Sequence, residues 1–314
     1  MAESAYVSPD MASIMGLIDT HLRWKELQKS GDRRYFKYHP SEWGGCLRQQ
    51  QYKHLAQLGH LEMVPSVHGS KLIRIFDTGH SMHDRWQQDY FAEMGILRGL
   101  WWCPKCEKTY GKEDKWGIFR PEKCDCGYDK GLVYKELSVH SDELNMSGHV
   151  DALLDFSRFD SNKYKGVKKA FNVDVFPDEP IVVDMKSCGD WPWKKQVMKL
   201  GVHKKYTVQL NIYIYLLGLK WGAVIYENKN DSNIAAFKVE KNNRMIETIK
   251  WQSQKMQDLA KHEPKPLLPP PKPDDKSCWD CGNCEFSDLC HASPVWDDAE
   301  RLKDMQQEFY RNLL

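Results

Sequence analysis

The sequence predicts an α/β fold in which a mixed central β-sheet is flanked by helices. Three observations support this prediction. Helix-type and strand-type patterns alternate along the chain without a regular repeat. The segment 181–185 (IVVDM) is a short β-branched run suited to a central, buried strand. The length of 314 residues is sufficient for one large domain or for a domain with inserts.

The N-terminal half contains helix-type patterns and one pair of strand-type patterns. We expect helices over 9–30, 42–58 and 70–94. Residues 101–130 are polar and contain four cysteines, which indicates an insert. Alternating apolar and polar residues predict two antiparallel strands over 133–141 and 144–156.

In the C-terminal half, residues 158–180 are typical of a loop, and regular structure follows the central strand. We expect a helix over 204–219, strands over 221–229 and 233–241, and a helix over 243–262. A stiff Pro-rich spacer (263–275) precedes the last cysteines and a final helix near 295–312. The expected organisation is therefore an N-terminal helical segment (1–69), a core (70–262) that carries the 101–130 insert, and a C-terminal segment (263–314).

The composition excludes some classes of protein. Lys and Arg number 45 against 44 Asp and Glu, so any surface that binds nucleic acid has to be local. There is no apolar run of eighteen residues, which argues against a membrane helix. The first residues lack the pattern of a secretory signal. We therefore expect a soluble, cytoplasmic protein without a membrane partner.

Five polar residues stand on elements that are otherwise apolar: Asp151, Asp184, Lys186, Gln209 and Tyr213. A buried carboxylate is costly unless it is paired or holds a metal. Lys186 lies two residues beyond Asp184, so in a strand both side chains point to one face. Gln209 and Tyr213 are one helical turn apart and share a face. The set predicts a cation site suited to phosphodiester hydrolysis, in which Lys186 holds the attacking water or offsets charge on the phosphorane.

Two further residues are candidates for this site. Glu136 lies on the neighbouring strand, and His83 lies on a helix face four residues after Gly79. A nitrogen ligand among oxygen ligands favours Mn²⁺, with Mg²⁺ as the alternative.

A basic stretch precedes Gln209 and is interrupted by Trp191 and Trp193. Basic residues follow phosphates and aromatic residues stack on exposed bases, although such a stretch is by default a solvated face. Its members are Lys194, Lys195, Lys199, His203, Lys204 and Lys205.

The order of these residues resembles the RecB-like branch of the PD-(D/E)XK nuclease superfamily. The motifs are G-x-x-x-H (79–83), Glu136, G-x-x-D (148–151), D-x-K (184–186) and Q-x-x-x-Y (209–213). The resemblance implies a restriction-endonuclease-like core. It also implies metal ligation by His83, Asp151, Asp184 and the main-chain carbonyl of Met185, with Lys186 as a catalytic residue. Glu136 aligns loosely with the family pattern.

The C-terminal cysteines extend the resemblance. One cysteine before the core (Cys46) and three after it (Cys281, Cys284 and Cys290) resemble the iron–sulfur staple of AddB-type and CRISPR adaptation nucleases. A [4Fe–4S] cluster needs four thiolates, and here it would join the N-terminal and C-terminal segments. Cys278 is an alternative fourth ligand, which leaves a local zinc site open.

The cysteines of the insert form a separate group with the spacing of a zinc ribbon. Cys103 and Cys106 make one short pair, and Cys124 and Cys126 make another. Two such pairs joined by a small hairpin predict a closed tetrahedral Zn²⁺ site. Cys188, next to the D-x-K motif, is expected to be an ordinary buried thiol.

Together these features predict a metal-dependent deoxyribonuclease that acts as an exonuclease on DNA ends or single strands in recombination, repair or phage DNA metabolism. No G-x-x-x-x-G-K-[ST] motif is present, so any unwinding would come from a partner helicase or from recombination or replication proteins. The alternatives are a structure-specific endonuclease or resolvase, and a nuclease-fold subunit that mainly binds DNA within a larger complex.

Overall fold

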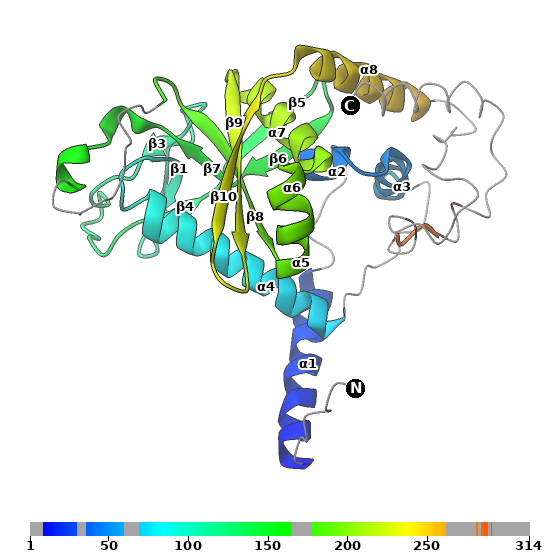
Figure 1. Cartoon of the computed structure of the whole chain (residues 1–314), viewed down its shortest axis with the longest axis horizontal. Coiled ribbons are helices and arrows are strands. Elements are labelled where there is room, and N and C mark those ends of the chain that lie inside the picture. Colours follow the sequence, from blue (N-terminus) through cyan, green and yellow to red (C-terminus); the bar gives the residue numbers. More distant parts are fainter. Residues whose placement is uncertain are drawn as a thin grey trace.

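A mixed β-sheet forms the centre of the protein (Figure 1). The computed structural model describes residues 9–29, 36–59, 69–164 and 177–261, together with 281, 284–287 and 290. The main path of the sheet has the order β10-β9-β8-β7-β1-β2, that is, Ile234–Glu240, Trp221–Asn228, Ile181–Cys188, Ala152–Leu154, Leu97–Trp102 and Thr109–Tyr110. Two further strands, β3 (Ile118–Phe119) and β4 (Val133–Lys135), pair with β1.

The pairing of β8 with β9 is parallel, and all the other strand pairs are antiparallel. The predicted mixed sheet is therefore confirmed. A parallel pair needs a crossover connection, which here is the helical segment between β8 and β9. Gly222 on β9 lies opposite Val182, and a Cβ atom at Gly222 would lie 2.6 Å from the Val182 carbonyl oxygen. Only glycine fits this close approach of the two strands.

Helices cover both faces of the sheet. One face packs against α4 (Ser70–Asp84) and its π-helical continuation η1 (Arg85–Phe91), and Met82 and Trp86 lie in one core cluster with Val183 and Met185. The other face packs against α7 (Lys204–Leu217), and Val182 shares a second cluster with residues of that helix. Successive β8 residues thus alternate between the two helices, as the period of a strand requires.

Three further helices and a long N-terminal helix complete the described fold. A third core cluster joins α7 to α2 (Pro40–Trp43) and α8 (Asn243–Leu259), while α3 is Leu47–Gln57. Asn242 caps α8, because its side chain accepts a hydrogen bond from the Met245 amide at 3.0 Å. The first helix, α1 (Pro9–Lys29), points away from the sheet and is tied to α4 by an Arg74–Asp19 ion pair (Figure 1).

Several predicted elements are interrupted where the structure needs a bend. The helix expected over 42–58 is two helices, α2 and α3, separated at Gly44, where a Cβ atom would lie 2.6 Å from the Lys205 Cα. The strand expected over 133–141 divides at Glu136 into β4 and β5 (Leu137–Ser141). The strand expected over 144–156 divides at Asp151 into β6 (Met146–Val150) and β7. Because β5 and β6 form a separate two-stranded sheet, both divisions mark the passage between the two sheets.

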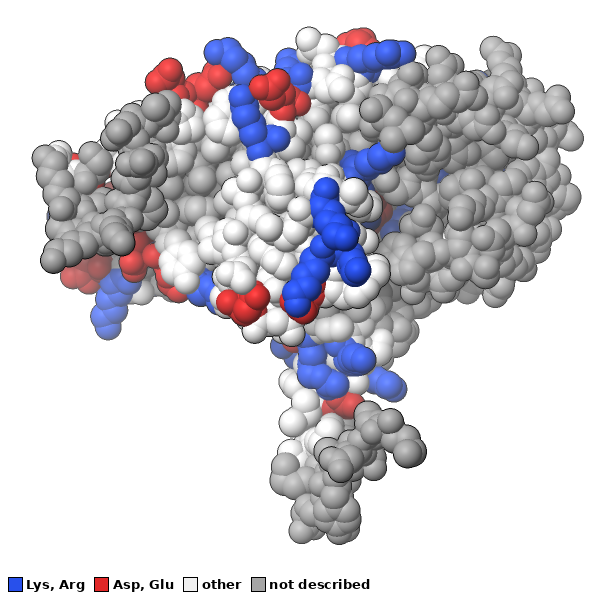
Figure 2. Space-filling view, viewed as in Figure 1, with Lys and Arg blue, Asp and Glu red and all other residues white. Residues whose placement is uncertain are grey.

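The segment between β8 and α7 is helical and protrudes from the sheet. It consists of α5 (Asp190–Pro192), the π-helical η4 (Trp193–Val197) and α6 (Met198–Leu200). Trp193 and Val197 are buried in the second core cluster, which fixes the segment to the sheet. Figure 2 shows basic side chains gathered over this segment, near the centre of the face in view.

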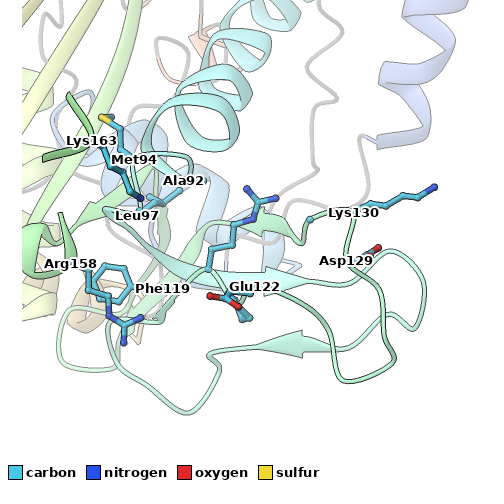
Figure 3. Close-up of a pocket in the computed structure, with 13 residues that line it drawn as sticks. Ala92, Met94, Leu97, Phe119, Glu122, Asp129, Lys130, Arg158 and Lys163 are labelled. Carbon is cyan, nitrogen blue, oxygen red and sulfur yellow. The ribbon is translucent and has the colours of Figure 1, made fainter. Parts of the chain in front are cut away.

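The cysteine insert follows β1, a core strand that the sequence patterns did not predict. Beside the insert lies a hollow of about 680 Å³, with Phe119, Arg120 and Arg158 among its lining residues (Figure 3). The Arg158 guanidinium lies 4.5 Å from the centre of the Phe119 ring, so it is already held by a cation–π contact.

No helix in the described ranges is long and apolar enough to cross a membrane. The Pro-rich spacer, Cys278 and the helix expected near 295–312 lie outside the described residues.

Candidate active site

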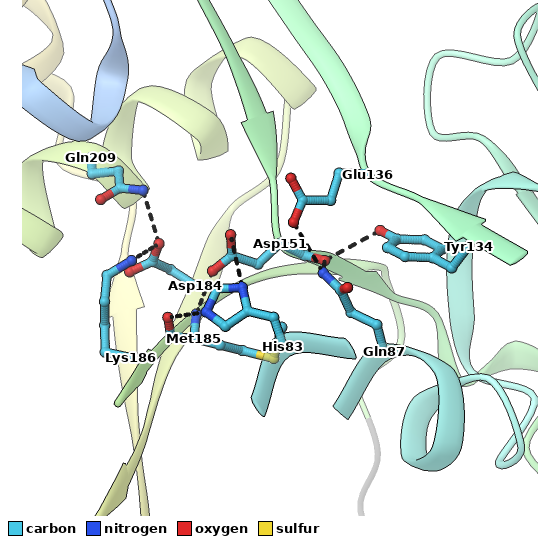
Figure 4. A network of polar contacts seen from close by, with 9 residues as sticks. All are labelled: His83, Gln87, Tyr134, Glu136, Asp151, Asp184, Met185, Lys186 and Gln209. Atoms are coloured by element: carbon cyan, nitrogen blue, oxygen red, sulfur yellow. Dashed lines mark hydrogen bonds and ion pairs between the residues drawn. The ribbon is translucent and has the colours of Figure 1, made fainter. Parts of the chain in front are cut away.

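The two strand divisions bring Glu136 and Asp151 to the same place, next to the end of α4 (Figure 4). Gln87 on η1 holds them there. Its side-chain amide donates to Glu136 Oε1 at 3.1 Å and to the Asp151 carbonyl oxygen at 2.7 Å. The Tyr134 hydroxyl donates to the same carbonyl at 3.3 Å. Both acidic residues are therefore positioned by buried partners and not by solvent.

His83 lies at the end of α4 and faces the same point. Its Nε2 is 3.0 Å from the Met185 carbonyl oxygen, and its Nδ1 is 3.8 Å from Asp151 Oδ1. Asp151 Oδ2 accepts a hydrogen bond from the Met185 amide at 2.7 Å, which ties β7 to β8. One ligand atom each of His83, Glu136 and Asp151 lies within 4.8 Å of the others. This spacing is small enough for one cation to contact all three side chains.

Asp184 and Lys186 lie on β8 and point toward α7. Lys186 Nζ donates to Asp184 Oδ1 at 2.6 Å, and Gln209 Nε2 donates to the same oxygen at 2.9 Å. The other carboxylate oxygen, Asp184 Oδ2, is buried and has no hydrogen-bond partner. An unpartnered buried carboxylate oxygen is costly, and a bound cation would remove this cost.

Electrostatics at this point are dominated by the acidic residues. Burial, together with the charge of Asp151, raises the pKa of Glu136 to about 7. Burial also raises the pKa of Asp184, although the charge of Lys186 opposes the increase. Burial by itself would lower the pKa of Lys186, but the charges of Asp184 and Asp151 reverse the direction and raise it. A third carboxylate and one lysine leave an excess of negative charge in a buried place, which favours a divalent cation.

These side chains fit a hard divalent cation. Carboxylate oxygens and a main-chain carbonyl are the donors that Mg²⁺ and Mn²⁺ prefer, and an imidazole nitrogen is compatible with Mn²⁺. The candidate ligands are His83, Glu136, Asp151 and Asp184, and the Met185 carbonyl oxygen lies beside the imidazole.

Tyr213 is placed differently from the expectation that it contacts a substrate or orients the lysine. It is 3% exposed and belongs to the core cluster beneath the sheet. Burial raises its pKa, and Asp151 and Asp184 add to the increase. The residue that contacts Lys186 is Tyr206, one face of which lies 4.9 Å from Nζ. Tyr213 thus packs behind the acidic residues, and Tyr206 contacts the lysine.

The sequence patterns did not single out Gln87, although one signal was available. Gln87 follows His83 by four residues, which places both side chains on one helix face. The neighbouring η1 residues Arg85 and Trp86 both bond the buried Glu227 on β9, the latter at 2.6 Å. These bonds hold η1 against the sheet and so support the position of Gln87.

The four cysteines of the insert converge. Their sulfur atoms all lie within 4.8 Å of one another, and the closest pairs are Cys103 with Cys126 at 3.7 Å and Cys106 with Cys124 at 3.5 Å. A tetrahedral ZnS₄ centre with bonds of about 2.3 Å has sulfur atoms about 3.8 Å apart. The Tyr110 hydroxyl, 3.1 Å from Cys124 Sγ, lowers the pKa of this thiol to about 6. The insert can therefore hold a metal ion in a closed tetrahedral site.

The remaining cysteines bring the two ends of the chain together. Cys46 lies close enough to Cys284 and Cys290 for their charges to affect it, and burial raises the pKa of the Cys46 thiol to about 12. Stacking of Tyr52 on Phe286, with ring centres 5.2 Å apart, joins α3 to the C-terminal segment. Arg48 donates to the Cys290 carbonyl oxygen at 3.4 Å. Cys281 is buried nearby in sequence, and Cys188 is a partly buried thiol whose pKa is raised by burial.

No protein-family model and no curated protein matches the sequence. Two solved structures are similar to the chain. SSO0001 is 16% identical, covers 89% of this chain and 98% of its own, and has a TM-score of 0.42. An alkaline exonuclease from Laribacter hongkongensis (LHK-Exo) is 13% identical, covers 72% of this chain and 88% of its own, and has a TM-score of 0.36. At these TM-scores neither similarity supports an inference about function.

Proposed function

We propose that the chain is a metal-dependent deoxyribonuclease of the RecB-like type that hydrolyses DNA phosphodiester bonds. The observation that carries the proposal is the convergence of three acidic side chains, an imidazole and a lysine, with Asp184 Oδ2 buried and unpartnered. This combination supplies oxygen and nitrogen ligands together with one cationic group. Hydrolysis of a phosphodiester requires both of these.

The side chains have separate roles in this proposal. A divalent cation bound by Asp151, Asp184, Glu136 and His83 would polarise the scissile phosphate and make an attacking water more acidic. The Lys186 ammonium group has three donors, and one of them bonds Asp184 Oδ1. Its other two donors are available for the attacking water or for the charge that develops on the phosphate oxygens. Gln209 and Gln87 keep Asp184 and Glu136 in place through hydrogen bonds.

For the substrate and pathway, the family resemblance supports exonuclease action on DNA ends or single strands in recombination, repair or phage DNA metabolism, with a helicase or recombination or replication proteins as partners. For the cysteines, we infer a Zn²⁺ ion at Cys103, Cys106, Cys124 and Cys126, because the sulfur spacing fits a ZnS₄ centre. We also infer a [4Fe–4S] cluster at Cys46, Cys281, Cys284 and Cys290, because thiols from both ends of the chain lie near one another.

Cleavage of end-labelled linear DNA and of circular single-stranded DNA tests the proposal. Protein with its metals intact is incubated with Mn²⁺, Mg²⁺ or EDTA, alongside Lys186→Ala. We expect degradation of the linear DNA only, dependent on the divalent cation and abolished in the variant. Cutting of the circle would assign an endonuclease. Tight DNA binding without Lys186-dependent cleavage would replace the proposal with the DNA-binding subunit.

A further inference from the structure

The helical segment 190–200 presents two opposite stripes of side chains. Trp193 and Val197 face inward and are buried, at 8% and 3% exposure. The outward stripe repeats at intervals of three and four residues, as one helix face does. It consists of Trp191, Lys194, Lys195, Met198 and Lys199. Trp191 is 65% exposed and Met198 is 61% exposed, so apolar surface alternates here with positive charge.

This surface carries little negative charge to balance the lysines. Asp190 pairs with Lys194 at 2.6 Å, and the sequence contains no further Asp or Glu until Glu227. Within the described ranges, Lys195 and Lys199 form no ion pair with an acidic side chain. Figure 2 shows the resulting group of basic side chains over α5 and α6. An uncompensated basic surface with an exposed tryptophan is complementary to a polyanion that carries flat apolar groups.

The outward stripe is joined directly to the candidate active site at both of its ends. On one side, Trp191 follows Lys186 by only five residues, and a chain of five residues spans at most about 17 Å. On the other side, the His203 amide donates to the Tyr226 hydroxyl at 3.2 Å, and the His203 ring lies 5.7 Å from that of Tyr206. Tyr206 in turn contacts the Lys186 ammonium group. A polymer bound on the stripe therefore lies beside the catalytic lysine.

We propose that the outward stripe of 190–200 is the binding platform for a single DNA strand that enters the active site. Trp191 stacks on an unpaired base, and Lys195 and Lys199 contact the phosphates that flank it. This inference rests on the proposed nuclease function and adds the form of the substrate. A base in a duplex is already stacked on both sides, so a protruding tryptophan selects a single strand.

Binding of a fluorescent oligothymidylate, measured by anisotropy without divalent cations, separates recognition from cleavage. Loss of one stacked base corresponds to about 1–3 kcal/mol, so Trp191→Ala should weaken binding by about 5–150-fold. Trp191→Phe should retain most of the affinity. Lys195→Ser with Lys199→Ser should reduce the slope of log Kd against log salt by about 1.4, at about 0.7 for each phosphate contact on a single strand.

Matched control variants exist on the C-terminal helix. Trp251 is 48% exposed on α8, so Trp251→Ala removes a similar exposed ring. Lys255→Ser with Lys261→Ser removes two charges from the same part of the chain. Neither control should alter the affinity or the salt slope. Because Trp191 is exposed, its variants are expected to fold, which the thermal transition verifies.

The outcomes distinguish this inference from the proposed function. If Trp191→Ala binds the oligothymidylate as wild type does, the platform is wrong, even when wild-type protein cleaves DNA. If Trp191→Ala weakens duplex binding as much as single-strand binding, the selection of a single strand is wrong. If binding depends on Trp191 while no Lys186-dependent cleavage occurs, the platform stands and the nuclease proposal fails.

Discussion

Replacement of Glu136 by Gln should stabilise the protein at alkaline pH when divalent cations are absent. In the folded protein the pKa of Glu136 is about 7, against an ordinary value of 4.5, because the carboxyl is buried near Asp151. A carboxyl whose pKa is higher in the folded state binds its proton more tightly there. The free energy of unfolding therefore falls as pH rises from about 4.5 to about 7. Glutamine has the same shape and does not titrate.

The magnitude follows from the two pKa values. Each pKa unit corresponds to about 1.4 kcal/mol, so the full difference amounts to about 3 kcal/mol. Between pH 5.0 and pH 8.5 the wild-type protein should lose about 2.5 kcal/mol of stability through this group. The Gln variant should not show this loss.

Urea unfolding at pH 5.0 and pH 8.5, in buffer free of divalent cations, measures the difference. Glu93→Gln is the control, because Glu93 is an exposed residue just beyond η1. Added Mn²⁺ should reverse the order at pH 8.5, since the wild type gains a bound cation that the variant binds less well. A wild-type-to-variant difference that does not change with pH would refute the reasoning, as would a Gln variant that is the less stable protein at pH 8.5.

Three further predictions concern the supporting residues and the cysteines. Gln87→Leu removes the donor to Glu136 Oε1 and should weaken Mn²⁺ binding by about 10–100-fold in calorimetric titration. Gln88→Leu, which alters only contacts to the Tyr134 backbone, should not, and equal effects would contradict the assignment. Cys124→Ser should lower the zinc content to below one equivalent and loosen residues 101–130 in hydrogen exchange while the core stays protected; unfolding of the core would argue against a separate insert. Cys46→Ala should remove the visible absorption and the iron of anaerobically purified protein, and retention of both would exclude Cys46 as a ligand.

Much of the fold was predictable because its signals are local. The β-branched run of β8 and the apolar pattern of α7 identified both elements without knowledge of their partners. The D-x-K spacing also placed Asp184 and Lys186 on one face, where the structure joins them at 2.6 Å. These predictions succeeded because strand period and helix period act over a few residues.

The remaining features depend on contacts between distant parts of the chain. The divisions at Glu136 and Asp151 arise because two strands leave one sheet and enter another, which no local pattern encodes. The role of Gln87 depends on Glu136, which lies 49 residues further along the chain. The division at Gly44 results from the close approach of Lys205 on α7. Tyr213 matched a sequence motif, but its burial became visible only once the sheet was packed against α7.

The most direct test of the metal-dependent centre is the anomalous diffraction of crystals soaked in Mn²⁺. We predict a peak in contact with the carboxylates of Asp151 and Asp184, with Glu136 and His83 around it, and no such peak in Asp184→Asn crystals treated identically. A peak only at other positions, or a peak at this position that persists in Asp184→Asn, would contradict the proposed centre.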